Sequence, residues 1–182
     1  GVSGLERRAR PALFTLTHSV LTSGGFAGFN EQMQNALSFA EPARPDRTLA
    51  LTRGVSRLFV DLGLAPLCEF RLANGRRADV AGIDRRGKLV IAEVKSCRAD
   101  FEADQKWPDY LDFCDLFYFA VDPDFPRELL PATQGLIIAD DYGAVIARPA
   151  EDRPLNAARR KAVTLRFARQ AAAKALFAPA LP

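Results

Sequence analysis

The run Leu89-Val-Ile-Ala-Glu-Val-Lys95 combines the strongest apolar pattern of the chain with two charges near its end. Its length and composition predict a buried β-strand. Because side chains alternate between the two faces of a strand, one face carries Leu89, Ile91, Glu93 and Lys95. A carboxylate and an amine on a buried face are costly unless they are paired, hydrated or bound to a metal ion. The strand end therefore carries either a functional site or a salt bridge that caps the strand.

The residues before this strand predict its partner. Asp84-Arg-Arg-Gly-Lys88 is typical of a type I turn followed by a left-handed glycine, which gives a three-residue hairpin loop. The resulting register places Asp79 opposite Glu93 on one face. A two-residue loop would instead turn Asp79 away from Glu93. Two acids beside an amine can hold Mg²⁺ or Mn²⁺, lower the pKa of a bound water and offset charge on a phosphoryl transition state.

The remaining pattern predicts an α/β protein. A helix is expected to begin at Asp46, a good N-cap, and to end near Gly63. The other expected elements are strands over 67–72, 78–83, 89–95 and 116–121, a helix over 100–114 broken at Pro108, strands over 135–139 and 144–147, and a basic helix over 155–177. The order is an αβββαβ core with a mixed central sheet flanked by helices, followed by a C-terminal basic helix. The expected buried stripe of that last helix is Leu165, Ala168, Ala172 and Leu176.

The length of 182 residues corresponds to about one domain with an extension. Residues 1–45 show weak periodicity, and we expect them to be an N-terminal extension that is weakly ordered or non-native. The only methionine is Met33, so whether residues 1–32 are native is left open. The predicted domain covers residues 46–182.

Composition excludes several classes of protein. With 48% hydrophobic and 26% charged residues, the chain resembles an ordinary globular protein. His18 is the single histidine, which argues against Ser-His-Asp or Cys-His catalysis and against a histidine-rich metal site. The three cysteines, Cys68, Cys97 and Cys114, lack a C-x-x-C spacing and predict reduced thiols in a cytoplasmic protein. No run approaches the ~18 apolar residues that span a membrane, so no membrane association is expected.

The charges are unevenly distributed. Residues 100–128 carry nine acids and two bases, whereas residues 151–182 carry seven bases and two acids. This pattern suits either a polyanion-binding protein with a cation site or a protein whose charges only solvate its faces. Asp109, Asp112 and Asp115 are expected to be solvated. The candidate phosphate contacts are Arg76, Arg77, Arg85, Arg86, Arg98, Arg159 and Arg160.

Several longer motifs are more specific than the strand itself. They are Asn74-Gly-Arg-Arg-Ala-Asp79, Ile91-Ala-Glu-Val-Lys-Ser96, Asp104-Gln-Lys-Trp-Pro-Asp-Tyr110 and Arg159-Arg-Lys-Ala-Val-Thr-Leu-Arg-Phe167. The chain resembles, through these motifs, the MmcB family of bacterial DNA-repair proteins and the PD-(D/E)xK, restriction-endonuclease-like superfamily. The resemblance implies a metal-dependent nuclease fold and a role in repairing damaged DNA.

Carried over by position, the resemblance implies that Asp79, Glu93 and Lys95 form the catalytic core. Asp79 and Glu93 would be the ligands of Mg²⁺ or Mn²⁺. The chain departs from the superfamily pattern at Ala78, where a proline is usual, and in the helix before the hairpin, which offers no glutamate ligand. Glu69, on the first expected strand, is the nearby substitute for that ligand.

The motif over 104–110 has two interpretations. Gln105, Lys106 and Tyr110 resemble the glutamine-then-tyrosine helix motif of RecB-type nucleases, with one extra residue in the spacing. In the first interpretation they contact phosphate or support Lys95. In the second they form an exposed polar face, with Trp107 and Tyr110 in the core.

Two functions remain open at this point. One is a Mg²⁺-dependent deoxyribonuclease that hydrolyses phosphodiester bonds during repair, which the complete acid–acid–lysine set favours. The other is a non-catalytic DNA-binding repair module that retains the nuclease fold, which the missing helix glutamate favours. DNA is the expected partner. The sequence leaves open the oligomeric state, a dimer included, and an association with other repair proteins.

Overall fold

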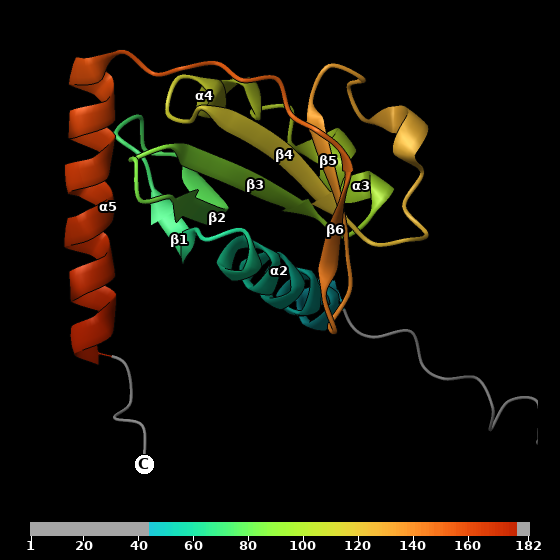
Figure 1. Cartoon of the computed structure of the whole chain (residues 1–182). Helices are drawn as coiled ribbons and strands as arrows, with labels where there is room; N and C mark the ends of the chain where they lie inside the picture. The colour runs from blue at the N-terminus through green and yellow to red at the C-terminus, as the bar shows by residue number, and fades with distance from the viewer. Residues whose placement is uncertain (1–43, 178–182) are drawn as a thin grey trace, which may run out of the picture. The chain divides into compact units, whose positions relative to one another are not determined.

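A six-stranded mixed sheet, in the order β1-β2-β3-β4-β5-β6, forms the centre of the protein (Figure 1). The computed structural model describes residues 44–177. The strands are β1 (Ala65–Arg71), β2 (Arg77–Ile83), β3 (Leu89–Lys95), β4 (Leu116–Val121), β5 (Gly135–Ala139) and β6 (Ala144–Arg148). β1 to β3 are antiparallel, β4 and β5 run parallel to β3, and β6 returns antiparallel. The expected α/β fold is confirmed, and the strand pair after the core extends the same sheet.

Helices cover both faces of this sheet (Figure 1). They are α2 (Arg44–Asp61), α3 (Arg98–Ala103), α4 (Pro108–Leu111) and α5 (Ala157–Phe177), with a 3-10 turn, η1, at Arg127–Leu129. α2 packs on one face together with Val90, Ala92 and Val94 of β3. The other helices pack with Leu89 and Ile91 on the opposite face, which is the alternation expected for β3.

The β2–β3 turn has the expected three-residue loop. The Asp84 carboxylate accepts a hydrogen bond from the backbone N–H of Lys88 at 2.7 Å. Gly87 has a φ of 79°, which only glycine adopts without strain. The register pairs Val80 with Ala92 and is the one that brings Asp79 toward Glu93.

The three expected helices differ in their bounds, and α5 begins two residues later than expected, at Ala157. α2 is already helical at Arg44, so Asp46 lies in its first turn instead of at the N-cap. The predicted helix over 100–114 consists of two short helices, α3 and α4. Pro108 lacks an N–H, and it occupies the first position of α4, where that N–H would have no partner within the helix.

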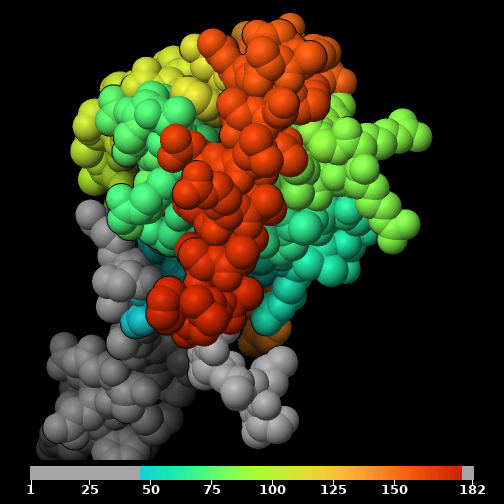
Figure 2. Space-filling view, turned by 90° about the vertical axis from the view of Figure 1, so that its left-hand side faces the viewer, coloured from blue at the N-terminus to red at the C-terminus, as the bar shows by residue number. Residues whose placement is uncertain are grey.

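α5 packs through a different face from the one predicted. Val163 and Phe167 are buried, and the Phe167 ring lies 5.5 Å from that of Phe70. The predicted stripe is exposed instead: Leu165, Ala168, Ala172 and Leu176. Figure 2 shows α5 lying along the surface of the molecule. An ion pair of Arg160 near the start of the helix fixes its rotation, because this side chain must face the sheet.

The predicted extension over 1–45 lies outside the described residues except for Arg44 and Pro45, which belong to α2. His18 and Met33 lie outside them as well. The three cysteines are free thiols in the structure. Between residues 44 and 177, no helix combines the length and the apolar character needed to cross a membrane.

Candidate active site

A cleft of about 1170 Å³ opens where β2 begins and β3 ends. α2 forms one of its walls, and the segment from α3 to α4 contributes another. The three predicted catalytic residues, Asp79, Glu93 and Lys95, all line this cleft. The hairpin register and the alternation of β3 thus bring together the residues that the sequence placed on one face.

The Glu93 side chain is 5% exposed, and neighbouring groups hydrogen-bond to only one of its two carboxylate oxygens. Its Oε1 atom lies 3.4 Å from the Tyr110 hydroxyl and 3.5 Å from Lys95 Nζ. Its Oε2 atom is buried and has no hydrogen-bond partner among the described residues. Burial, with a further contribution from the Asp79 carboxylate, raises the pKa of Glu93 to about 8. A proton or a cation is therefore strongly favoured at this carboxylate.

Asp79 sits where the β2–β3 ladder ends. The last backbone pair before it is Val80 with Ala92, and beyond that pair the Asp79 Oδ2 atom accepts the N–H of Val94 at 2.8 Å. Burial raises the pKa of Asp79 to about 6, although the Val94 N–H opposes this shift. The bond to Val94 fixes the carboxylate beside Glu93.

Lys95 is 3% exposed and lies between two carboxylates. Its Nζ atom is 3.0 Å from Asp104 Oδ2 and 3.5 Å from Glu93 Oε1. Burial lowers the pKa of Lys95, but the attraction of Glu93 and Asp104 outweighs burial and the net shift is upward. The pKa of Asp104 is lowered in turn, because its bond to Lys95 outweighs burial. Lys95 is therefore a fixed cation in the cleft.

The residues of the 104–110 motif have separate roles. Tyr110 is buried, its ring stacks on Phe117, and its hydroxyl can donate to Glu93 or to the carbonyl of Arg77 at 3.1 Å. Burial and the neighbouring Glu93 carboxylate raise the pKa of Tyr110, which keeps the phenol neutral. Gln105 donates to the backbone carbonyl of Phe101 in α3 at 3.0 Å, and no hydrogen bond joins it to Lys95 in the described part of the chain. Of the three predicted residues, Tyr110 is the one that contacts Glu93.

Three residues of the cleft were not found from the sequence. Arg53 and Arg57 of α2 line it, and their spacing of four places them on one face of the helix. Asp104 provides the hydrogen-bonded partner of Lys95. It was visible in the sequence as an acid two residues before Lys106, but that spacing does not reveal a contact with β3.

The cleft offers two carboxylates to a metal ion. Glu69 does not join them, because its carboxylate pairs with Arg77 at 2.6 Å. Over residues 44–177 no three His, Cys, Asp or Glu side chains are grouped closely enough to hold a metal. Mg²⁺ commonly takes one or two carboxylates and completes its coordination with water and substrate oxygens. The unpartnered Oε2 of Glu93 beside Asp79 therefore fits Mg²⁺ or Mn²⁺.

The predicted phosphate contacts fall into separate groups. Arg76 and Arg77 line the cleft. Arg98, on α3, pairs with Glu102 at 2.7 Å. Arg85 and Arg86 lie in the β2–β3 turn, and the seven-residue strand β3 separates that turn from the cleft by ~20 Å.

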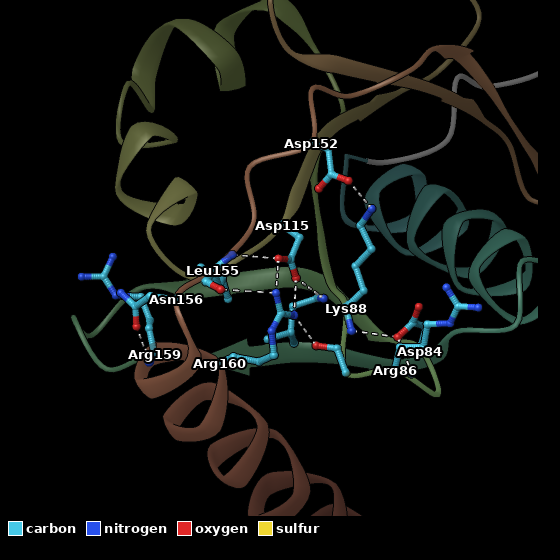
Figure 3. Close-up of polar contacts among 11 residues, drawn as sticks. Asp84, Arg86, Lys88, Asp115, Asp152, Leu155, Asn156, Arg159 and Arg160 are labelled. Carbon is cyan, nitrogen blue, oxygen red and sulfur yellow. Dashed lines mark hydrogen bonds and ion pairs between the residues drawn. The ribbon is translucent and has the colours of Figure 1, made fainter.

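The two arginines at the start of α5 are held by acids, as Figure 3 shows for Arg160. Arg159 pairs with Asp112 at 2.9 Å. Arg160 binds both carboxylate oxygens of Asp115, at 2.7 and 2.8 Å. Asp115 is 1% exposed, so the expectation that it is solvated is wrong. Its carboxylate anchors α5 to the sheet.

We expect Glu93→Gln to stabilise the metal-free protein, and to do so more at pH 8 than at pH 5. Folding raises the pKa of Glu93 from its usual value of about 4.3 to about 8, so the folded protein loses stability as the pH rises between those values. Glutamine has no charge to bury, so it removes this loss, which is on the order of 2 kcal/mol or more. Urea unfolding in EDTA at the two pH values measures the effect. An equal difference between variant and wild type at both pH values would contradict it.

The fold and the cleft define a mixed α/β protein with two carboxylates and a lysine gathered at the strand ends. The chain belongs to the MmcB-like DNA repair protein family, whose model matches residues 35–179. It is also similar to a solved structure of a protein of unknown function from Silicibacter pomeroyi, at 45% identity and a TM-score of 0.68. That similarity covers 74% of this chain and 90% of the other. Curated proteins gave no match. Family membership gives the chain a role in DNA repair.

Proposed function

We propose that this DNA-repair protein is a metal-dependent deoxyribonuclease. The observation that carries the proposal is the buried, unpartnered Oε2 of Glu93, which lies in the same cleft as Asp79 and the charged Lys95. The family supports DNA as the substrate. The resemblance to PD-(D/E)xK nucleases supports phosphodiester hydrolysis as the reaction.

Each residue of the cleft has a distinct part in this reaction. Asp79 and Glu93 would hold Mg²⁺ or Mn²⁺, and the bound ion would supply a water of lowered pKa and offset charge on the phosphoryl group. Lys95 orients the attacking water or stabilises the negative charge that develops on the phosphate oxygens. Tyr110 hydrogen-bonds Glu93 Oε1 and so fixes the orientation of that carboxylate. Arg76 lines the cleft, where it pairs with Asp109 at 2.7 Å, and it would contact flanking phosphates.

The test uses the full chain with duplex, single-stranded, flap and branched DNA in Mg²⁺ or Mn²⁺. We expect cleavage that EDTA stops and that Asp79→Asn lowers by about 10²-fold or more. Calorimetric titration with Mn²⁺ alone should show weaker binding to that variant. Asp112→Asn is the matched control, because Asp112 is an exposed acid paired with Arg159 outside the cleft. Cleavage that survives Asp79→Asn would refute the assigned site.

The second candidate is a DNA-binding repair module without cleavage. The side of α2 that lines the cleft presents hydroxyl side chains at Thr48, Thr52 and Ser56, and the cleft-lining residues of α2 include no acid. A third carboxylate ligand is therefore missing from that wall. Salt-sensitive DNA binding without cleavage in either metal would favour this function over the nuclease.

A further inference from the structure

The turn between β5 and β6 presents an aromatic side chain to solvent. Tyr142 is 90% exposed, more than any other large hydrophobic side chain in the described part of the chain. Exposing an aromatic ring forgoes the burial that normally stabilises it. The fold therefore does not depend on this ring, and its role must be sought outside the core.

The backbone that carries Tyr142 is fixed by hydrogen bonds. Asp140 Oδ1 accepts the N–H groups of Tyr142 and Gly143, each at 2.8 Å. The N–H of Asp140 donates to the carbonyl of Gly143 at 2.9 Å. These hydrogen bonds fix the backbone that carries the exposed ring, so little backbone entropy is lost when a ligand binds to the ring.

The same turn packs directly against α2. A Cβ atom added to Gly54 would lie 2.3 Å from the carbonyl oxygen of Asp140 and 2.6 Å from that of Gly143. Glycine is unfavourable inside a helix, and here the close approach of the turn requires it. α2 and the turn thus form one continuous surface at this point.

Two arginines join this turn to the cleft. Arg53 pairs with Asp141 at 3.1 Å, and Arg57 donates to the backbone carbonyls of Asp141 and Tyr142. Both arginines line the cleft that holds the acid–acid–lysine cluster. The hydrogen bonds of Arg57 go to carbonyl oxygens, so its positive charge is available to a phosphate.

We propose that Tyr142 is a stacking platform for an unpaired nucleobase, with Arg57 binding a phosphate of the same strand as it enters the cleft. Proteins bind single strands in this way, combining exposed aromatic rings with basic groups that follow the backbone. A base inside a duplex has both faces covered by its neighbours and cannot use such a ring. This inference rests on the proposed function and narrows its substrate to DNA with an unpaired strand, such as a single strand or a flap.

The test compares DNA binding by fluorescence anisotropy in EDTA, using a single-stranded oligonucleotide and its duplex. We expect Tyr142→Ala to weaken single-strand binding by about 5- to 100-fold and to change duplex binding little. Tyr142→Phe keeps the ring and should bind as the wild type does. Phe177→Ala is the matched control, since Phe177 is 83% exposed at the end of α5 and does not line the cleft. A 2-aminopurine base in the single strand should be quenched by the wild type and less so by Tyr142→Ala.

The outcomes separate this inference from the proposed function. Single-strand binding that is unchanged in Tyr142→Ala would overturn the stacking platform while leaving a nuclease in place. An equal loss on single strand and duplex, or the same loss in Phe177→Ala, would also overturn it. If the wild type binds neither DNA, the proposed function fails, and an exposed Tyr142 would instead point to a partner protein.

Discussion

Replacing Lys95 with methionine is expected to lower the rate of metal-dependent DNA cleavage by about 10²- to 10³-fold. Methionine keeps the unbranched shape of the side chain but removes the only cation bonded to Glu93 and Asp104 in the described structure. In the proposed reaction Lys95 acts on the reacting phosphate, so we expect the loss in the rate of cleavage and not in DNA affinity. Single-turnover cleavage at saturating DNA and Mn²⁺ measures it.

The matched control for this variant is Lys106→Met. Lys106 lines the same cleft but is exposed, and its side chain has no buried carboxylate partner among the contacts that the structure gives. We expect it to change DNA affinity and its salt dependence slightly, with an unchanged rate at saturation. Equal rate losses in both variants would show that general positive charge, and not Lys95, supports cleavage. Fluorescence melting checks that both variants are folded.

The strands were predictable because residues next to them in the sequence determine where they begin and end. β3, β4 and β5 have the predicted bounds, since each is an apolar run ended by turn residues or prolines. The register followed from the turn, because Asp84 and Gly87 favour a three-residue loop over the two-residue alternative, and the structure has that loop. The pairing of Asp79 with the end of β3 could therefore be expected before any contact was known.

The contacts between distant side chains were not predictable in the same way. Asp104 reaches Lys95 from the residue that follows α3, so this contact depends on where that helix ends. The rotation of α5 depends on Arg160 meeting a buried acid 45 residues earlier in the chain. Helical periodicity shows which apolar residues share a face of the helix. It does not show that an ion pair with a distant acid turns a different face toward the sheet.

That anchor gives the largest expected effect on stability: Asp115→Ala should lower the free energy of unfolding by about 3–5 kcal/mol. The Asp115 carboxylate accepts the backbone N–H of Leu89 at 2.7 Å and that of Leu155 at 2.9 Å, besides both bonds from Arg160 (Figure 3). Alanine leaves the N–H groups of Leu89 and Leu155 without this buried acceptor and removes the carboxylate partner of Arg160. Urea unfolding followed by the fluorescence of Trp107, the single tryptophan, measures the loss.

Asp152→Ala is the control in the same corner of the molecule. Its carboxylate pairs with Lys88 at 2.7 Å but is 56% exposed, so the variant should cost at most about 1 kcal/mol. A similar loss in both variants would contradict the anchor.

The pH dependence of the free energy of unfolding provides a second test of the role of the Asp115 carboxylate. Burial raises the pKa of Asp115, but the bonds from Arg160 and the two N–H groups outweigh burial and hold it below its usual value. The stabilisation is then present above the unfolded pKa of about 3.9 and is lost as the pH falls through the lower folded value. We therefore expect the gap in stability between the wild type and Asp115→Asn to be constant above about pH 5 and to shrink below about pH 4. A stability difference between the wild type and Asp115→Asn that stayed constant into strong acid would contradict this. It would mean that the packing of α5, and not the charge of Asp115, holds the helix in place.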